Sequence, residues 1–278
     1  MKGFLDFCRR YAQNRAALGG LATIVAIVAM AVVGPWLHPV DPFETAGRPY
    51  SPPFGQFLLG TDVSGRDILA GIIRGAPVSL AIGVAASLCA TIVGVALGAV
   101  AGYYGGLIDD AIMRTTEFFL TIPSFILAVV LVAIFSPTVV SITIAIAVVS
   151  WPSVARLVRG EYIAQREREY VQACRALGMP DWEIILAQIL PNAAAPVVVV
   201  STLMVATAIL TESGLSFLGL GDPNHISWGY MIGVARTALR TAWWMAAIPG
   251  LMIVIAVIAI NLAGEGLNDA LNPKLRER

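Results

Sequence analysis

The chain has 278 residues, of which 58% are hydrophobic and 13% are charged, and its formal net charge is zero. A soluble domain of this length carries more charge on its surface, and a protein that binds nucleic acid in bulk carries a basic excess. The composition excludes both classes and predicts a polytopic membrane protein with no nucleic-acid partner.

Six apolar stretches are long enough to cross a bilayer core of about 30 Å, which takes about 20 residues of helix. A chain in lipid must satisfy its own backbone hydrogen bonds, so these stretches predict an all-α fold with six transmembrane helices. The predicted spans are Leu18–Leu37, Pro77–Tyr103, Phe118–Phe135, Pro137–Ala155, Pro191–Thr211 and Ala242–Gly264.

Residues 1–17 precede the first span and have apolar side chains at helical spacing, which predicts an amphipathic segment at the membrane surface. A cleaved signal peptide is the alternative, because Ala29-Met30-Ala31 resembles a cleavage site. The apolar run continues past that point, which favours an uncleaved first span over residues 18–37.

Residues 38–76 connect the first two spans and are predicted to form an external loop. Ser64 and Asp67 stand in a variant of the capping box just before the apolar residues 68–73. This pattern predicts a short surface helix that leads into the second span.

The second span carries Gly94, Gly98 and Gly102 at four-residue spacing. Small residues at this spacing leave a flat helix face that another backbone can approach closely. The pattern predicts close helix packing, and a helix–helix seam that moves is the alternative.

A charged segment, residues 169–191, interrupts the apolar sequence between the fourth and fifth spans; we call it the elbow. Good helix formers run from Glu161 to Leu177, and Gly178 fits the left-handed position that ends a helix. Pro180 discourages the helix from resuming, and Asp181 is placed to cap a second helix that begins at Trp182.

Tyr170, Ala173, Cys174 and Leu177 are expected to share one face of the first elbow helix. A solvated loop would need neither this apolar stripe nor a defined turn. The elbow is therefore interpreted as a docking surface, with the solvated loop as the alternative.

Glu212 is the lone candidate for a residue on a transport path, near the far end of the fifth span. Hydrogen bonding to the glycine-rich turn that follows is the competing interpretation. Beyond that turn, Trp228, Tyr230, Trp243 and Trp244 fit an aromatic belt at the external membrane interface.

Basic residues predict the orientation of the spans. With the N-terminus in the cytoplasm, 13 of the 18 Lys and Arg residues fall on the cytoplasmic side. Both termini and the elbow of this multi-pass membrane protein are therefore expected in the cytoplasm.

The interiors of the second to sixth spans hold no Asp, Glu, Lys, Arg or His. A carrier driven by protons normally needs a titratable group there, although sodium coupling through backbone carbonyls stays open. The only lysines are Lys2 and Lys274, so no phosphate-binding loop of the Walker type is present. Any ATP used would be hydrolysed on another polypeptide.

Cys8, Cys89 and Cys174 lie far apart, and so do His38 and His225. This spacing predicts neither a disulfide framework nor a zinc site. We therefore expect no metal site and no catalytic residue in the chain.

The elbow resembles the cytoplasmic loop signature of bacterial ABC-importer permeases, which reads Glu-Ala-Ala, three residues, Gly, and later Ile-x-Leu-Pro. The corresponding residues here are Gln172-Ala173-Cys174, then Gly178, and then Gln188-Ile189-Leu190-Pro191. The first Glu, the second Ala and the first Ile of the signature are replaced, while the turn and the Leu-Pro pair are kept.

Further stretches resemble the dipeptide/oligopeptide/nickel subfamily of these permeases, and in particular the second of the two permeases that such systems pair. Together the resemblance covers about residues 55–265. The stretches are residues 60–67, 74–80, 102–109 and 211–221.

The resemblance implies a type I ABC-importer permease fold with a coupling-helix elbow. The permease domain would span residues 77–265, with a coupling loop at 160–191 and a cytoplasmic tail at 266–278. The implied function is uptake of dipeptides or oligopeptides by alternating access; a nickel or metallophore permease and a secondary carrier are the alternatives.

The implied partners are a second permease in a heterodimer, two cytoplasmic ATPase subunits that hold ATP and Mg, an extracytoplasmic solute-binding protein, and membrane lipid. The chain itself would need no cofactor. The residues expected to couple to the ATPases are Glu169, Tyr170, Gln172, Ala173, Cys174, Leu177, Gly178, Asp181, Trp182 and Pro191.

Overall fold

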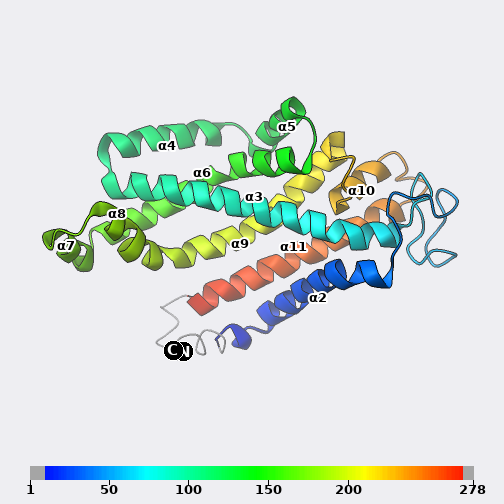
Figure 1. The fold of residues 1–278 in the computed structure, drawn as a ribbon, viewed down its shortest axis with the longest axis horizontal. Coiled ribbons are helices and arrows are strands. Elements are labelled where there is room, and N and C mark those ends of the chain that lie inside the picture. The colour runs from blue at the N-terminus through cyan, green and yellow to red at the C-terminus, as the bar shows by residue number, and fades with distance from the viewer. Residues whose placement is uncertain (1–9, 272–278) are drawn as a thin grey trace.

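The computed structural model describes residues 10–271, and the regular structure in that range is helical apart from a single β-bridge between Thr61 and Asp67. The helices run roughly along one direction of an elongated molecule (Figure 1). They are α2 (Arg15–Leu37), α3 (Ile68–Tyr104), α4 (Gly106–Thr121), α5 (Ser124–Phe135), α6 (Val139–Arg166), α7 (Glu169–Ala176), α8 (Asp181–Glu183), the π-helix η1 (Ile184–Ile189), α9 (Leu190–Leu215), the π-helix η2 (Ser216–Leu220), α10 (Trp228–Ala235) and α11 (Trp244–Leu271).

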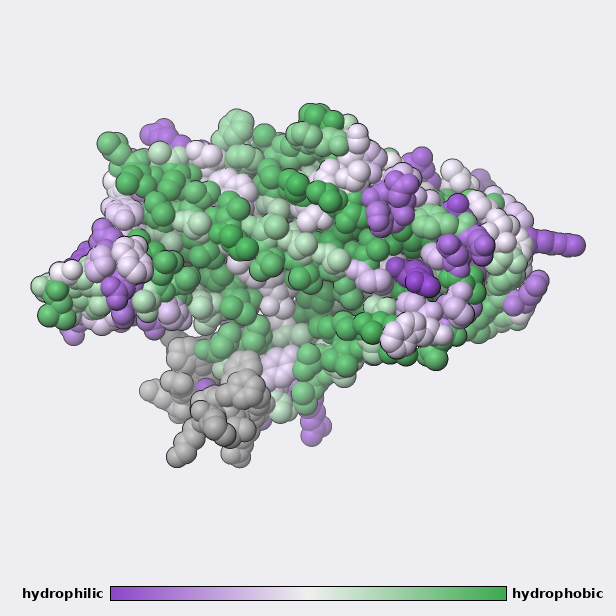
Figure 2. All heavy atoms as spheres, viewed as in Figure 1, coloured by the Kyte–Doolittle hydropathy of each residue, from purple (hydrophilic) through white to green (hydrophobic). Residues whose placement is uncertain are grey.

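Five helical stretches are long and apolar enough to cross a membrane by themselves: α2, α3, α6, α11 and the run from α8 to η2. On the face shown in Figure 2, apolar side chains cover the middle of the molecule and hydrophilic ones gather toward its ends. This distribution suits a protein whose middle lies in lipid.

The expected span over 118–135 is not one continuous helix, because α4 and α5 are bent by 87° where they meet. Ile122 is extended, with φ −87° and ψ 127°, and Pro123 follows it. A proline disfavours the helical conformation of the residue before it, which explains the break. The two helices count as a sixth span only if the bent pair crosses as one unit.

The expected short helix over 68–73 is not separate from the second span, because α3 runs without interruption from Ile68 to Tyr104 with Pro77 inside it. Residues Ile72, Ile73 and Ala76 around the proline are buried. Their packing stabilises the helix at a position where proline removes one backbone hydrogen bond.

The cap of α3 is Asp67, whose Oδ1 accepts a hydrogen bond from Leu69 N–H at 2.9 Å. Ser64 was expected to take part but instead donates its own N–H to Asp62. The other oxygen of Asp67 lies 2.7 Å from His38 Nε2, beyond the end of α2. This contact joins the outer ends of the first two spans.

The glycine stripe of α3 packs against α6, which confirms the prediction of close helix packing. A Cβ atom on Gly98 would lie 2.5 Å from the carbonyl oxygen of Ala155, and one on Gly94 would lie 2.5 Å from Cβ of Val154. Helix backbones this close leave no room for a larger side chain.

The beginning of α2 and the end of α11 lie side by side, joined by a hydrogen bond of 3.0 Å from Asn14 Nδ2 to Asp269 Oδ2. Both point toward the same end of the molecule as α7 (Figure 1). Residues 1–9 of the predicted amphipathic segment, 1–17, lie outside the described residues, and within 10–17 all but Asn14 are helical. Because α11 continues to Leu271, the first residues of the predicted tail, 266–278, belong to that helix.

Candidate functional site

The elbow projects from one end of the molecule, where α7 and α8 lie in Figure 1. The expected continuous helix over 161–177 is wrong, because α6 ends at Arg166 and Arg168 is extended before α7 begins. The break allows Val171 to enter a hydrophobic cluster with Tyr162 and Ile184, where it is fully buried. Burial of this side chain favours the break over a straight helix.

Gly178 has φ +77°, which confirms the predicted left-handed end of the first elbow helix. The N–H of Met179 donates to the carbonyl of Cys174 at 3.1 Å, and that of Gly178 donates to Arg175 at 3.0 Å. These two bonds satisfy carbonyls that a helix end leaves without partners.

Asp181 does not cap the second elbow helix as expected, because Pro180 occupies the cap position. Its Oδ1 instead accepts a hydrogen bond of 2.6 Å from Tyr103 Oη, at the end of α3. The guanidinium of Arg175 lies over the same tyrosine ring, 4.8 Å from its centre. Arg166 Nη1 also donates to the carbonyl of Tyr103 at 3.3 Å.

A second tyrosine joins the elbow to α6, since Tyr162 Oη donates to the carbonyl of Ile185 at 3.0 Å within η1. The elbow is thus attached to the ends of both α3 and α6, so a force applied to it would reach both helices. Sequence reasoning missed Tyr103 and Val171. Tyr103 lies 78 positions from Asp181, and no local pattern relates the two.

The elbow exposes three large apolar side chains, with exposed fractions of 85% for Leu177, 65% for Trp182 and 56% for Leu186. The stripe expected on α7 divides: Tyr170 and Cys174 pack inward, while Ala173 and Leu177 face out. Exposed apolar residues on a polar segment are typical of a docking surface. The other predicted coupling residues Glu169, Gln172, Gly178, Asp181 and Pro191 are also exposed.

Glu212 lies near the opposite end of the molecule and is 1% exposed. Its Oε1 accepts hydrogen bonds from Ser216 Oγ at 2.8 Å and from Ser227 Oγ at 2.7 Å. Ser227 also caps α10 by accepting from Tyr230 N–H at 2.9 Å. Glu212 therefore ties α9 to α10, and its role on a transport path stays a prediction.

Replacing Glu212 with Leu is expected to destabilise the protein by about 1–3 kcal/mol, because the buried hydroxyl groups of Ser216 and Ser227 lose their acceptor. Glu212→Gln keeps an oxygen at this place and should be nearly neutral. Thermal unfolding in detergent measures both, with Thr211→Val on the same helix turn as the control. Equal losses for the Gln and Leu variants would show that the charge, not the acceptor, matters.

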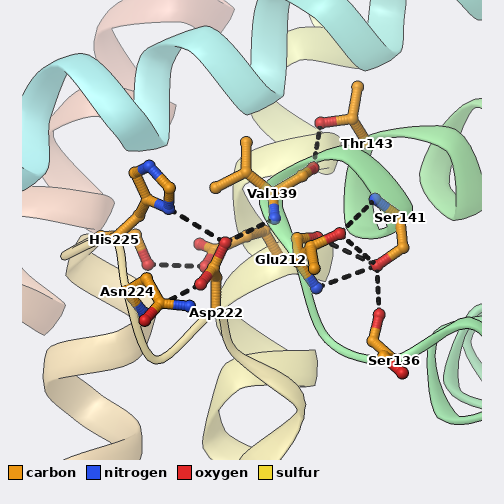
Figure 3. A network of polar contacts seen from close by, with 10 residues as sticks. Ser136, Val139, Ser141, Thr143, Glu212, Asp222, Asn224 and His225 are labelled. Carbon is orange, nitrogen blue, oxygen red and sulfur yellow. Dashed lines mark hydrogen bonds and ion pairs between the residues drawn. The ribbon is translucent and has the colours of Figure 1, made fainter.

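Asp222 anchors the turn after η2 to the beginning of α6 (Figure 3). Its carboxylate accepts from the N–H groups of Val139 and Asn224, both at 2.9 Å, and lies 3.0 Å from His225 Nδ1. Burial raises the pKa of the Asp222 carboxyl, but these contacts outweigh burial and hold the pKa below its ordinary value. The ionised form also suits the positive end of the α6 dipole.

The aromatic belt expected beyond this turn is wrong for Trp228, which is fully buried. Its Nε1 donates to the carbonyl of Ile72 and its backbone N–H to Ser79 Oγ, both at 3.0 Å. Trp244 is also buried, whereas Trp243 is 63% exposed. Contacts with α3 decided the position of Trp228, and they follow from tertiary packing alone.

Among residues 10–271, no three His, Cys, Asp or Glu side chains gather as a metal site would require. The candidate machinery in this range therefore consists of the elbow at one end and the network of Glu212 and Asp222 at the other. The first exposes apolar side chains, and the second holds the turn after η2 in place.

Comparisons with known proteins identify a family to which the sequence is similar. Residues 94–277 match the family described as "binding-protein-dependent transport system inner membrane component". Residues 4–53 match the "N-terminal TM domain of oligopeptide transport permease C".

Several relatives match nearly the whole chain, among them two peptide permeases. A di/tripeptide transport system permease protein of Pseudomonas aeruginosa is 41% identical over 280 residues, which is 98% of this chain and 92% of the relative. A dipeptide transport system permease protein of Bacillus subtilis is 38% identical over 274 residues, 98% of this chain and 86% of the relative.

Among solved structures, an inward-facing form of the MetNI methionine ABC transporter is similar, with a TM-score of 0.58 and 20% identity. The match covers 73% of this chain and 96% of the other. At this identity the likeness is one of fold.

Proposed function

The chain belongs to the family of binding-protein-dependent transport system inner membrane components, and from this premise we propose that partner ATPases drive it through the elbow. It is a permease subunit of an ATP-driven importer with the type I fold, and hydrolysis takes place in separate subunits. The observation that carries the proposal is an elbow that exposes Leu177 and Trp182 while it is attached to α3 and α6.

The cargo class is short peptides, as in the relatives named for dipeptides and tripeptides. The comparisons give no support to the nickel or carrier alternatives. An extracytoplasmic solute-binding protein would deliver the peptide. ATP and Mg would be held by the ATPase subunits, because this chain lacks an interior lysine for a phosphate-binding loop.

The chain would form a heterodimer with a second permease, and membrane lipid would cover the rest of its apolar surface. Both termini and the elbow would lie in the cytoplasm. The excess of basic residues on that side supports this orientation. The fold also supports it, because the beginning of α2, the end of α11 and the elbow helix α7 lie toward the same end of the molecule (Figure 1).

Substitution of Leu177 by Asp tests the docking role. A charge at an apolar contact of this kind should weaken ATPase binding by at least about 2 kcal/mol, roughly 30-fold in affinity. Co-purification of the ATPase with a tagged permease from detergent-solubilised membranes measures the loss. Membrane insertion should be unaffected, because the side chain is 85% exposed.

The matched control is Leu107→Asp, since Leu107 is 87% exposed near the end of α3 that holds the elbow. That variant should bind the ATPase normally. Normal ATPase recovery with Leu177→Asp would contradict the docking role.

A further inference from the structure

A hollow of about 350 Å³ lies between η2 and α10, at the end of the molecule opposite the elbow. Its volume is at the small end of the range for ligand pockets, about 300–1,000 Å³, and suits one or two amino-acid residues. Its lining includes Ser216, Gly219, Gly221, Tyr230, Arg236 and Thr237.

Glycine keeps this hollow open. Gly219 has φ +89° inside η2, a conformation that other residues rarely adopt. A Cβ atom on Gly221 would lie 2.7 Å from Ser216 Oγ, so a larger residue there would displace the serine that binds Glu212. The hollow is thus bounded by a backbone turn whose shape the buried Glu212 network supports.

Arg236 supplies the positive charge of the hollow. Its Nη1 lies 3.4 Å from the carbonyl of Phe217, which holds the guanidinium beside the Gly219 turn. The ion pairs among residues 10–271 involve other side chains, so Arg236 has no acidic partner there. A guanidinium with open donors and no counter-charge is suited to bind a carboxylate through two parallel hydrogen bonds.

Two hydroxyl groups accompany this charge. Tyr230 and Thr237 also line the hollow, and neither hydroxyl forms a hydrogen bond to another residue in the range 10–271. A carboxylate accepts from several donors at once. A guanidinium beside free hydroxyl groups therefore matches its chemistry.

We propose that this hollow is a subsite for the C-terminal carboxylate of the peptide cargo, with Arg236 as its ligand. The inference rests on the proposed function, because it takes a peptide as the cargo. Every unmodified peptide ends in a carboxylate whatever its side chains are. A single fixed cation near the external entrance would therefore hold cargo of any sequence by the negatively charged terminus that all such peptides share.

The test measures binding to the assembled permease–ATPase complex in nanodiscs without the solute-binding protein, so that the receptor's own selectivity plays no part. Saturation-transfer NMR compares the dipeptide Ala-Phe with its C-terminal amide. The native complex should bind the free acid better. Arg236→Gln should weaken binding of the acid by about tenfold or more and leave the amide unchanged, since a charge-assisted pair is lost.

Arg240→Gln is the matched control, because Arg240 is also exposed and four residues away but does not line the hollow. It should keep the preference for the acid. Arg236→Lys keeps the charge without the planar fork and should reduce that preference partially. If the Gln variant fails to assemble, the Lys variant alone tests whether Arg236 binds the carboxylate.

Equal loss of acid and amide would indicate that Arg236 positions the turn or binds a lipid headgroup, and it would overturn the proposal. So would an unchanged preference for the acid in both Arg236 variants. Recovery of the ATPase with each variant separates this outcome from failure of the proposed function, which would show as loss of the ATPase from the native permease.

Discussion

Gly98→Leu is expected to prevent assembly of the helical bundle. A Cβ atom at this position would already lie 2.5 Å from the carbonyl oxygen of Ala155 and 2.8 Å from Cβ of Val158. Leucine adds three further carbons at a contact between two backbones, so α3 and α6 must separate. Even Gly98→Ala should cost about 1–3 kcal/mol, the usual range for overpacking, and Leu should cost more.

The measurement is the yield and thermal unfolding of the detergent-solubilised protein, followed by fluorescence-detected size exclusion. Gly160→Ala is the control, because Gly160 lies on α6 and a Cβ atom there would meet nothing within 4 Å. It should be neutral or stabilise the helix by up to about 1 kcal/mol. Native-like yield and unfolding temperature for Gly98→Leu would show that this seam is looser than the distances indicate.

Gly178→Pro is expected to abolish ATP-dependent peptide uptake while the bundle still inserts and folds. Proline is confined to φ near −65°, whereas Gly178 has φ +77°. Proline also lacks the N–H that donates to the carbonyl of Arg175. The two arms of the elbow would then leave the turn in different directions, and the surface around Leu177 and Trp182 would be lost.

Uptake by reconstituted importers and co-purification of the ATPase both report on this change. Gly178→Asn is the control, because Asn accepts left-handed conformations better than other non-glycine residues and should retain most of the coupling. Gly178→Ala should fall between the two, at a conformational cost of about 1–2 kcal/mol. Full ATPase recovery with Gly178→Pro would contradict the coupling role of the turn.

The features that sequence analysis predicted correctly are local. The apolar runs around α2, α3, α6, α9 and α11 identify spans, because the length of a helix that crosses lipid is set by the bilayer. Gly178 was recognised as a left-handed turn, because only a residue without a β-carbon adopts that conformation at little cost. The spacing of Gly94, Gly98 and Gly102 predicted a close helix contact, but it did not predict that α6 is the helix packed there.

The failures concern helix breaks and partners, where distant contacts compete with local preference. Helix formers on both sides of residue 167 predicted continuity, but burial of Val171 favours an interruption. Asp181 has a side chain suited to cap a helix, but its Oδ1 accepts a hydrogen bond from Tyr103 Oη instead. Trp228 matched an interfacial residue in type, but α3 supplied two acceptors for it in the interior, the carbonyl of Ile72 and the hydroxyl of Ser79.

Composition, span length and the glycine turn were thus enough to predict an all-helical membrane protein of several spans with an elbow that a partner could hold. Each of these depends on bilayer thickness or on the conformational limits of one residue, and both act within a short stretch of chain. Three-dimensional packing alone decided that the elbow is tied to Tyr103, that Glu212 joins α9 to α10, and that Arg236 lines a hollow. The residues in such contacts are far apart in the chain, and their energies depend on burial and geometry that exist only once the helices have packed.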